Sequence, residues 1–370
     1  VPHEVLKAIS APLVGHLDPE FIRIMEEAKA MLRKVFLTEN EMTFPVSGTG
    51  SAGMECCFVN LVEPGDEVVV CINGVFGMRM AEVAERCGAV VIKVESEWGR
   101  IIETEQVAEA LKGRNPKLVA VVHAETSTGA QTPIEEISRI THEAGALILL
   151  DAVTSLGGIP LRIDDWEIDA VYSGTQKCLS CPPGLAPVSF SKDAMKVITG
   201  RSSKVQSWYL DINLLAGYWG GNRVYHHTAP ISMNYAFHES LRLILEEGLE
   251  SRWKRHLDNH LALKKGLKVM GLEIVSQEGH QLPQLNAVEI PDGVDEAAVR
   301  GRLLSEHDIE IGPGLGPLKG KIWRVGLMGE TSKKENVCRF LNAFGRILND
   351  QGFRNETEAA VAAANEGGAL

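Results

Sequence analysis

Two charged side chains stand where apolar segments of the sequence end. Asp151 follows the apolar residues Ala146–Leu150, and Lys177 follows Ala170–Tyr172 after a short polar segment. If both apolar segments are buried strands, a carboxylate and an amine lie at strand ends of one sheet. Burial disfavours either charge unless it has a partner or a chemical task. These two residues are therefore the first candidates for a functional site.

This pair has two interpretations. In the structural one, Asp151 and Lys177 form a buried ion pair that serves only the fold. In the chemical one, they form a site for pyridoxal 5′-phosphate (PLP). There a desolvated lysine with a lowered pKa attacks the cofactor aldehyde to give a Schiff base. The aspartate keeps the pyridine nitrogen protonated, so that the ring accepts electrons.

A glycine-rich turn, residues 48–53, follows a short apolar run and precedes an expected helix. It fits the GxGxxG pattern of dinucleotide sites, but that pattern also needs an acidic residue at the end of the next strand. Here Ile72 is followed by Asn73 and Gly74, so the sequence disfavours NAD. A broader interpretation remains, because N–H groups at a helix N-terminus bind phosphate well. A tight structural turn is the alternative.

The elements that must position these residues alternate along the first part of the chain. We expect strands at Glu67–Ile72, Ala89–Val94, Leu118–His123, Ala146–Leu150, Ala170–Tyr172 and Pro187–Phe190. We expect helices at 21–36, 51–61, 77–87, 104–112 and 134–144. Apolar strands separated by helices indicate a mainly parallel sheet with helices on both faces. Such sheets bind ligands at the carboxyl ends of their strands.

The pattern changes after about residue 230. A long helix is expected from Met233 to about Met270, followed by strand candidates near 272–275, 287–290 and 322–327 and a helix near 295–306. The sequence therefore predicts an α/β protein with a large domain over residues 1–247 and a smaller α+β domain over residues 248–370.

Composition excludes several classes of protein. The chain has 370 residues, 45% of them hydrophobic, which is typical of a soluble protein of two or three domains. No apolar run approaches the ~20 residues of a membrane span. The net charge of −12 disfavours a nucleic-acid partner.

Seven scattered cysteines indicate reduced thiols and a cytoplasmic location. Cys178 and Cys181 form a lone CxxC, so no metal is expected. The sequence begins at Val1 rather than Met, and an upstream targeting segment stays an open alternative.

The sequence as a whole resembles the class V, fold type I PLP-dependent aminotransferases, within them the alanine:glyoxylate (serine:pyruvate) group. The resemblance runs from about Val5 to Leu348. It is carried, in order, by residues 46–50, 63–66, 73–77, 125–129, 151–158, 173–177, 182–184, 225–228 and 320–326. It implies a large domain with a mainly parallel, seven-stranded sheet between helices. Members of the group usually begin with a Gly/Pro-rich segment beside the substrate site, and Val1 lies just after that point.

The resemblance implies a role for each residue around the cofactor ring. Lys177 forms the Schiff base and moves the proton between substrate Cα and cofactor C4′. Asp151 pairs with the pyridine nitrogen. Phe76 stacks on one face of the ring, Val153 packs on the other, and Thr126 reaches the ring hydroxyl.

The resemblance also implies how the phosphate and the substrate are held. The phosphate contacts from the same chain are Gly50, Ser51, Gln176 and, more weakly, Thr49. Tyr225 and Thr228 reach the phosphate from the neighbouring subunit, which implies a homodimer with shared active sites. Arg324 binds the substrate α-carboxylate through two parallel hydrogen bonds, which a lysine would do poorly.

The implied reaction is a ping-pong transamination through pyridoxamine phosphate. The donor is a small L-amino acid, alanine or serine, and the acceptor is a 2-oxo acid such as glyoxylate or pyruvate. A single carboxylate-binding arginine suits small, neutral side chains. The sequence leaves the donor open, because a hydroxyl or methyl difference is worth only about 1–3 kcal/mol in an apolar pocket.

Three other functions are alternatives to this one. Pyridoxamine:pyruvate aminotransferases carry an acid at the phosphate turn and an extra arginine in the small domain, where this sequence has Thr49 and Leu315. Class V lyases such as cysteine desulfurases stack a histidine on the ring and place another before the lysine. Phe76 and Gln176 stand at those positions here. A PLP-binding protein without activity is disfavoured by the intact charged residues.

Overall fold

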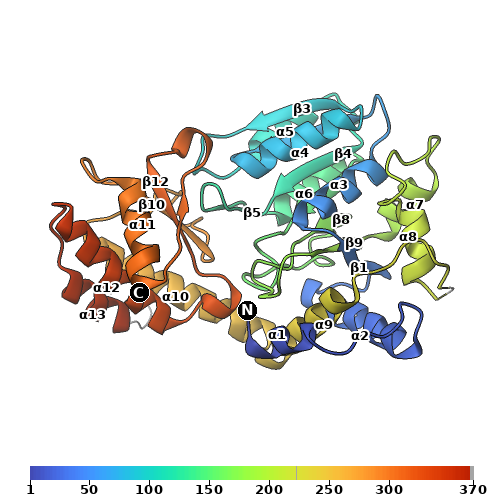
Figure 1. Cartoon of the computed structure of the whole chain (residues 1–370). Helices are drawn as coiled ribbons and strands as arrows, with labels where there is room; N and C mark the ends of the chain where they lie inside the picture. The colour runs from blue at the N-terminus through green and yellow to red at the C-terminus, as the bar shows by residue number, and fades with distance from the viewer. Residues whose placement is uncertain (222, 367–370) are drawn as a thin grey trace.

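The computed structural model describes residues 1–221 and 223–366. Figure 1 shows a large lobe around a central sheet and a smaller lobe formed by the C-terminal part of the chain. Among the described residues, no helix is both long and apolar enough to cross a membrane.

The central sheet has seven strands within the described residues, in the order β1-β9-β8-β7-β4-β2-β3. They are β1 (Met42–Ser47), β2 (Glu67–Ile72), β3 (Val90–Glu95), β4 (Leu118–Val122), β7 (Leu147–Asp151), β8 (Ala170–Tyr172) and β9 (Leu185–Phe190). Only β9 runs against its neighbours; β3, β2, β4, β7 and β8 pair in parallel. The predicted α/β fold with a mainly parallel sheet is confirmed.

The residues of strand β1 were described from the sequence only as a short apolar run before Gly48, and this strand contains Pro45. Proline lacks the N–H that a central strand needs, and it is tolerated at a sheet edge. β1 is an edge strand that pairs with β9 alone, which explains how Pro45 fits.

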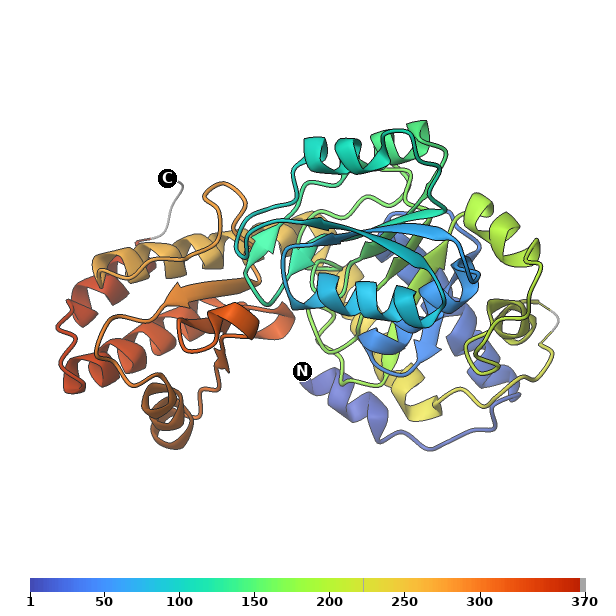
Figure 2. The ribbon, with the colours of Figure 1, turned by 90° about the horizontal axis from the view of Figure 1, so that it is seen from above.

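Helices cover both faces of this sheet (Figure 2). They are α1 (His3–Ile9), α2 (Pro19–Phe36), α3 (Gly50–Leu61), α4 (Val75–Arg86), α5 (Thr104–Leu111), α6 (Glu135–Glu143), α7 (Lys192–Thr199), α8 (Ile212–Trp219) and α9 (Ile231–Glu247). Side chains alternate across a strand, so Val68 and Val70 enter the core beneath α3 and α4, and Val69 enters the core beneath α5 and α6.

The smaller lobe is an α+β unit with its own core around Trp323 and Phe344. Its strands are β10 (Leu285–Glu289), β11 (Gly312–Pro313) and β12 (Ile322–Gly326), all antiparallel, and its helices are α10 (Leu249–Val269), α11 (Glu296–His307), α12 (Lys334–Asp350) and α13 (Thr357–Asn365). The strand expected at 272–275 is reduced to one bridge between Ile274 and Val288.

The long helix expected from Met233 to Met270 is two helices. Gly248, at φ 82°, ends α9 and begins α10. Glycine adopts a positive φ without steric cost, and helical periodicity in the sequence runs through this break unchanged. The division into domains 1–247 and 248–370 stays a prediction.

Candidate active site

A buried carboxylate lies at the carboxyl end of β7. Asp151 Oδ1 accepts a hydrogen bond from the Val153 N–H at 2.9 Å, and Oδ2 accepts one from the Tyr172 hydroxyl at 2.7 Å. Burial raises the pKa of Asp151 to about 6, although both hydrogen bonds oppose the rise. Both donors are neutral. A protonated ring nitrogen would therefore supply the positive charge that this carboxylate lacks.

Lys177 follows β8 and is partly buried. Burial lowers the pKa of Lys177 and the Arg324 guanidinium lowers it further, whereas Asp151 raises it only weakly. Among the described residues, the bonding partners of Asp151 are Val153 and Tyr172, not Lys177. The geometry thus argues against the structural ion pair that the sequence left open. An amine with a lowered pKa suits nucleophilic and proton-transfer work.

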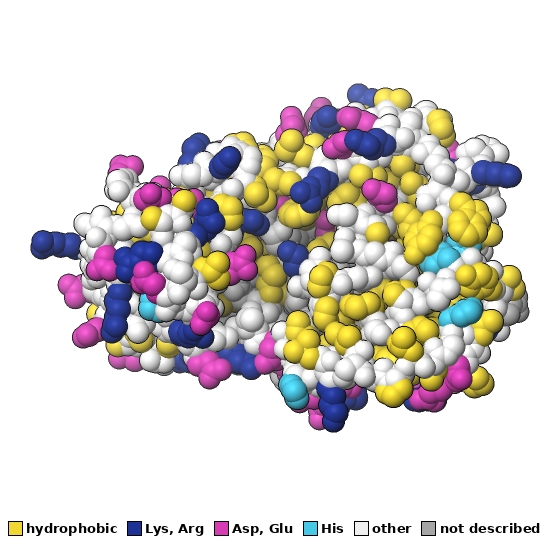
Figure 3. Space-filling view, viewed as in Figure 1, with side chains coloured by type: hydrophobic (Ala, Val, Ile, Leu, Met, Phe, Trp, Pro, Cys, Tyr) yellow, Lys and Arg dark blue, Asp and Glu magenta, His cyan; other side chains and the backbone are white. Residues whose placement is uncertain are grey.

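A cavity of about 520 Å³ lies where the two lobes meet, and Lys177, Gln176 and Arg324 line it. Figure 3 shows this side of the molecule hollowed between the lobes. Arg324, on β12, donates from Nε to the Pro313 carbonyl at 2.8 Å and from Nη1 to the Thr126 carbonyl at 3.2 Å. These bonds fix the guanidinium and leave N–H groups for a substrate carboxylate.

The glycine-rich turn packs against the ends of β7 and β8. A Cβ built on Gly50 would lie 3.0 Å from Val153 Cγ2, and one on Gly174 would lie 3.4 Å from Gly50 Cα. Helix α3 begins at Gly50, and no side chain caps it at Thr49. Its first N–H groups and positive dipole end are suited to a phosphate. Thr49, Ser51 and Gln176 have exposed side chains around the same turn.

The backbone of Phe76 is held by Glu125, a buried acid to which the sequence gave no separate role. Glu125 Oε2 accepts hydrogen bonds from the backbone N–H groups of Phe76, at 3.1 Å, and Gly77, at 3.4 Å. Its Oε1 accepts two bonds from Ser127. Glu125 therefore holds the start of α4, and the neighbouring Thr126 is buried beside it. The available signal was an acid just after an apolar strand, the same signal that identified Asp151.

Tyr172 is the second functional residue that sequence reasoning missed. It ends β8 directly opposite Asp151 in the sheet register. Its position inside an apolar strand made it look like a core residue, and only the register brings its hydroxyl to the carboxylate.

Tyr225 and Thr228 are not brought to this site within one chain. Both side chains are exposed, and the two hydroxyls lie 3.2 Å apart. Among the described residues, neither hydroxyl bonds to another predicted site residue. Around them the surface is aromatic: Trp208 packs on His226, and Tyr209 stacks on His227.

The histidines in that surface do not form part of a metal centre. Within residues 1–221 and 223–366, no three His, Cys, Asp or Glu side chains are grouped so that they could hold a metal ion.

Comparisons with known proteins extend over most of the chain. The family model for class-V aminotransferases matches residues 6–326. The chain is 40% identical over 366 residues to (S)-ureidoglycine–glyoxylate transaminase of Bacillus subtilis, covering 94% of this chain and 88% of that protein. It is 39% identical over 348 residues to alanine–glyoxylate aminotransferase of Mus musculus, covering 93% and 84%. The crystal structure of alanine–glyoxylate aminotransferase from Nostoc sp. matches with a TM-score of 0.92 and 48% identity, covering 93% and 91%.

Proposed function

The chain belongs to the class-V aminotransferase family of PLP-dependent, fold type I enzymes, and from this premise we propose its substrates and the work of its residues. The reaction is transamination from a small L-amino acid, alanine or serine, to glyoxylate or pyruvate. The observation that carries the proposal is one cavity lined by both Lys177 and Arg324. An amine for proton transfer and an anchor for an α-carboxylate thus face the same space.

The residues present fit PLP. When bound, PLP supplies an aldehyde that combines with the substrate amine and a ring that accepts electrons from Cα. Asp151, held by Val153 and Tyr172, would keep the ring nitrogen protonated. Phe76 and Val153 would pack on the two ring faces, and Thr126 would bind the ring hydroxyl. The phosphate would be bound at the start of α3 by Thr49, Gly50, Ser51 and Gln176.

Lys177 moves the reacting proton in this proposal. Burial lowers the pKa of the Lys177 amine, which favours the uncharged form that can take the proton from substrate Cα. Arg324 binds the α-carboxylate, and its fixed guanidinium orients the Cα–H bond toward Lys177. A single carboxylate-binding arginine suits donors with small, neutral side chains.

(S)-Ureidoglycine is a second candidate donor. The observation that favours it is the 40% identity to the Bacillus subtilis transaminase that acts on it. Both donors share an α-carboxylate and an α-amine, so the residues above serve either one. The acceptor glyoxylate is common to both relatives.

We also propose a homodimer with shared active sites. Tyr225 is 54% exposed and Trp208 is 63% exposed, and large exposed apolar patches typically mark interaction surfaces. A second copy of the chain would cover this surface, and it would place Tyr225 and Thr228 at the phosphate of the neighbouring site.

The test is an absorption spectrum of the protein loaded with PLP. L-Alanine should remove the yellow absorbance and glyoxylate should restore it. Serine and (S)-ureidoglycine, measured in the same way, identify the preferred donor. If none of alanine, serine and (S)-ureidoglycine removed the yellow absorbance, the proposed substrates would be contradicted. A protein that takes up no PLP would contradict the proposed roles of Lys177 and Asp151.

A further inference from the structure

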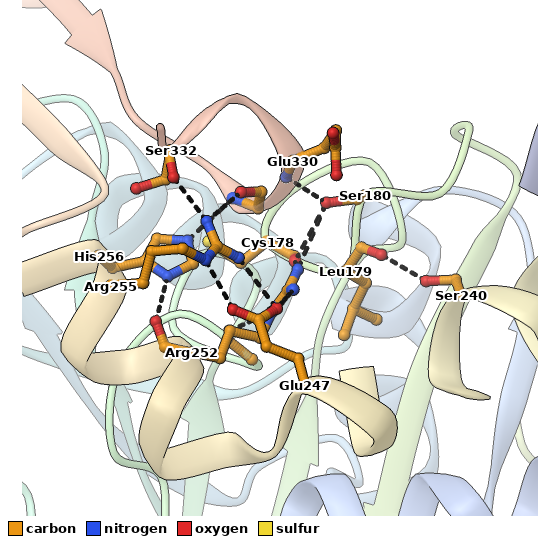
Figure 4. A network of polar contacts seen from close by, with 12 residues as sticks. Cys178, Leu179, Ser180, Ser240, Glu247, Arg252, Arg255, His256, Glu330 and Ser332 are labelled. Atoms are coloured by element: carbon orange, nitrogen blue, oxygen red, sulfur yellow. Dashed lines mark hydrogen bonds and ion pairs between the residues drawn. The ribbon is translucent and has the colours of Figure 1, made fainter. Parts of the chain in front are cut away.

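The loop that follows Lys177 is held by a buried arginine at the junction of α9 and α10. Arg252 is 5% exposed. Its Nε donates to the Gly157 carbonyl at 2.9 Å, and its Nη2 donates to the Cys178 carbonyl at 2.5 Å (Figure 4). Gly157 lies beyond Asp151 on the chain, and Cys178 is the residue after Lys177. One guanidinium therefore ties together the segments that follow both chemical groups of the sheet.

The same loop is held from the small lobe. The Glu330 N–H donates to Ser180 Oγ at 2.7 Å. Gly329 has φ 58°, and a Cβ on it would lie 2.8 Å from the Cys178 carbonyl oxygen and even closer to Ser180 Oγ. The backbone of the small lobe thus lies directly against the lysine loop. Residues 329–330 come shortly after β12, the strand that carries Arg324.

Helix α10 binds this small-lobe segment as well. Arg255 donates from Nη1 to the carbonyls of Gly329, at 2.9 Å, and Ser332, at 2.6 Å. His256 Nε2 accepts the Gly329 N–H at 2.9 Å. The two carboxylate oxygens of Glu247 accept hydrogen bonds from the guanidinium groups of Arg252 and Arg255. Figure 4 shows these side chains converging between the lobes. We call Ser180, Glu247, Arg252, Arg255, His256 and Gly329 the junction cluster.

We propose that the junction cluster is a positioning device that sets the separation of Lys177 and Arg324. This proposal rests on the proposed function, in which one group moves the Cα proton and the other binds the carboxylate of the same substrate. The two groups come from different lobes, so a rigid connection between the lobes must fix their distance. Rates of proton transfer depend steeply on such placement, and a 1 Å error costs on the order of 100-fold.

The test uses small changes at the contact between the lobes. Ser180→Ala removes the acceptor of the Glu330 N–H, and Gly329→Ala inserts a methyl group against the lysine loop. Both should move the lysine loop away from Arg324. We expect kcat/KM for the amino donor to fall about tenfold in Ser180→Ala and about 100-fold in Gly329→Ala. Arg252→Lys should behave like Gly329→Ala, because an ammonium cannot span both carbonyls.

A second readout does not depend on turnover. In cofactor-free protein, the reactivity of Lys177 with an amine-labelling reagent, followed by mass spectrometry against pH, reports its pKa. Burial and the Arg324 charge lower this pKa, whereas Cys178 and Asp151 raise it. Separation of the lobes weakens both lowering effects, so the labelling midpoint of the variants should move to higher pH.

The matched control is Arg242→Met. Arg242 on α9 also bridges two glutamates, Glu239 and Glu246, but it is exposed. The Arg242→Met variant should keep the kinetics and the labelling profile of the wild type. Ser180→Ala and Gly329→Ala variants that unfold at lower temperature, yet keep wild-type kcat/KM and labelling, would show that the cluster only stabilises the fold. A wild type without transaminase activity would instead contradict the proposed function, and the labelling midpoints would still decide the positioning role.

Discussion

The inner and outer parts of the proposed active site differ in how completely one chain supplies the hydrogen-bond partners of their side chains. The inner part, Glu125, Asp151 and Tyr172, is buried, and the chain's own donors hold both carboxylates. The outer part consists of exposed side chains: Thr49, Ser51, Gln176, Tyr225 and Thr228. Within the described residues, the hydroxyls of Tyr225 and Thr228 have only each other as side-chain hydrogen-bond partners.

This difference indicates which part of the proposed site is already formed before a ligand binds. The inner part is fixed by sheet register and helix starts, so it exists before any ligand binds. The outer part presents uncapped N–H groups of α3 and exposed hydroxyls, which can bind an anion or contact a second chain. Substitutions in the inner part should therefore change chemistry and stability together. Substitutions in the outer part should change binding and leave stability alone.

The largest effect is expected at Lys177, where the inner and outer parts meet. Lys177→Ala removes the group that moves the Cα proton, and nothing else in the cavity replaces an amine of lowered pKa. Alanine–glyoxylate transamination should fall by roughly 10⁴-fold or more. Lys192→Ala, at an exposed position at the start of α7, is the control and should keep full activity. Retention of more than a few per cent of activity would remove Lys177 from the mechanism.

Asp151→Asn, in the inner part, should lower activity and raise the stability of the cofactor-free protein. Loss of the charge beside the ring nitrogen should lower kcat/KM by about 10²- to 10³-fold. The folded-state pKa of about 6 lies above the ordinary 3.8, so the ionised carboxylate destabilises the cofactor-free protein. That destabilisation is complete above pH 6 and fades as the pH falls toward 3.8. At ~1.4 kcal/mol per pKa unit it amounts to about 3 kcal/mol.

The amide also loses one acceptor, which costs about 1 kcal/mol. Cofactor-free Asp151→Asn should therefore be more stable than the wild type by about 2 kcal/mol at pH 8 and by less than about 1 kcal/mol at pH 5. Chemical unfolding at the two pH values measures this difference. Equal stability of the two proteins at pH 8 would mean that the carboxylate is better solvated than its burial implies.

The sequence could predict which residues stand at strand ends, but not which of them touch. Asp151 and Lys177 were identifiable because each follows an unbroken apolar strand. The Tyr172 hydroxyl could not be assigned, because its contact depends on β7 and β8 pairing with Asp151 opposite Tyr172. Glu125 depends on a segment after β4 approaching the start of α4. The break at Gly248 was missed because one positive φ angle leaves the apolar pattern intact.

Tyr172→Phe tests whether the inner part acts as a unit. The change removes the Tyr172 hydroxyl. In the wild type this hydroxyl donates to Asp151 Oδ2 and thereby lowers the pKa of the Asp151 carboxyl. The pKa of Asp151 should rise further, and kcat/KM should fall about tenfold. Loss of a hydrogen bond to a charged group should cost about 1.5–3 kcal/mol. Tyr218→Phe, which removes a hydroxyl bonded to the His16 carbonyl, should leave kcat/KM unchanged. If the two variants had identical kinetics, the hydrogen bond from Tyr172 to Asp151 would not be required for activity.

The smallest effect is expected in the outer part. Tyr225→Phe removes one exposed hydroxyl, so the free energy of unfolding should change by less than about 0.5 kcal/mol. Retention of PLP should weaken only several-fold, measured by dilution of the loaded protein. Tyr209→Phe, on the same aromatic surface, is the control and should retain PLP like the wild type.

Mixing two variants decides whose site Tyr225 serves. In a hybrid of one Lys177→Ala chain and one Tyr225→Phe chain, the one remaining Lys177 belongs to the Tyr225→Phe chain. If Tyr225 reaches the neighbouring site, that lysine is matched with the intact tyrosine of the Lys177→Ala chain. The active half of the hybrid should then bind PLP with wild-type strength. If Tyr225 served its own chain, the hybrid would keep the weakened binding of Tyr225→Phe, and the outer part would be no more shared between chains than the inner part.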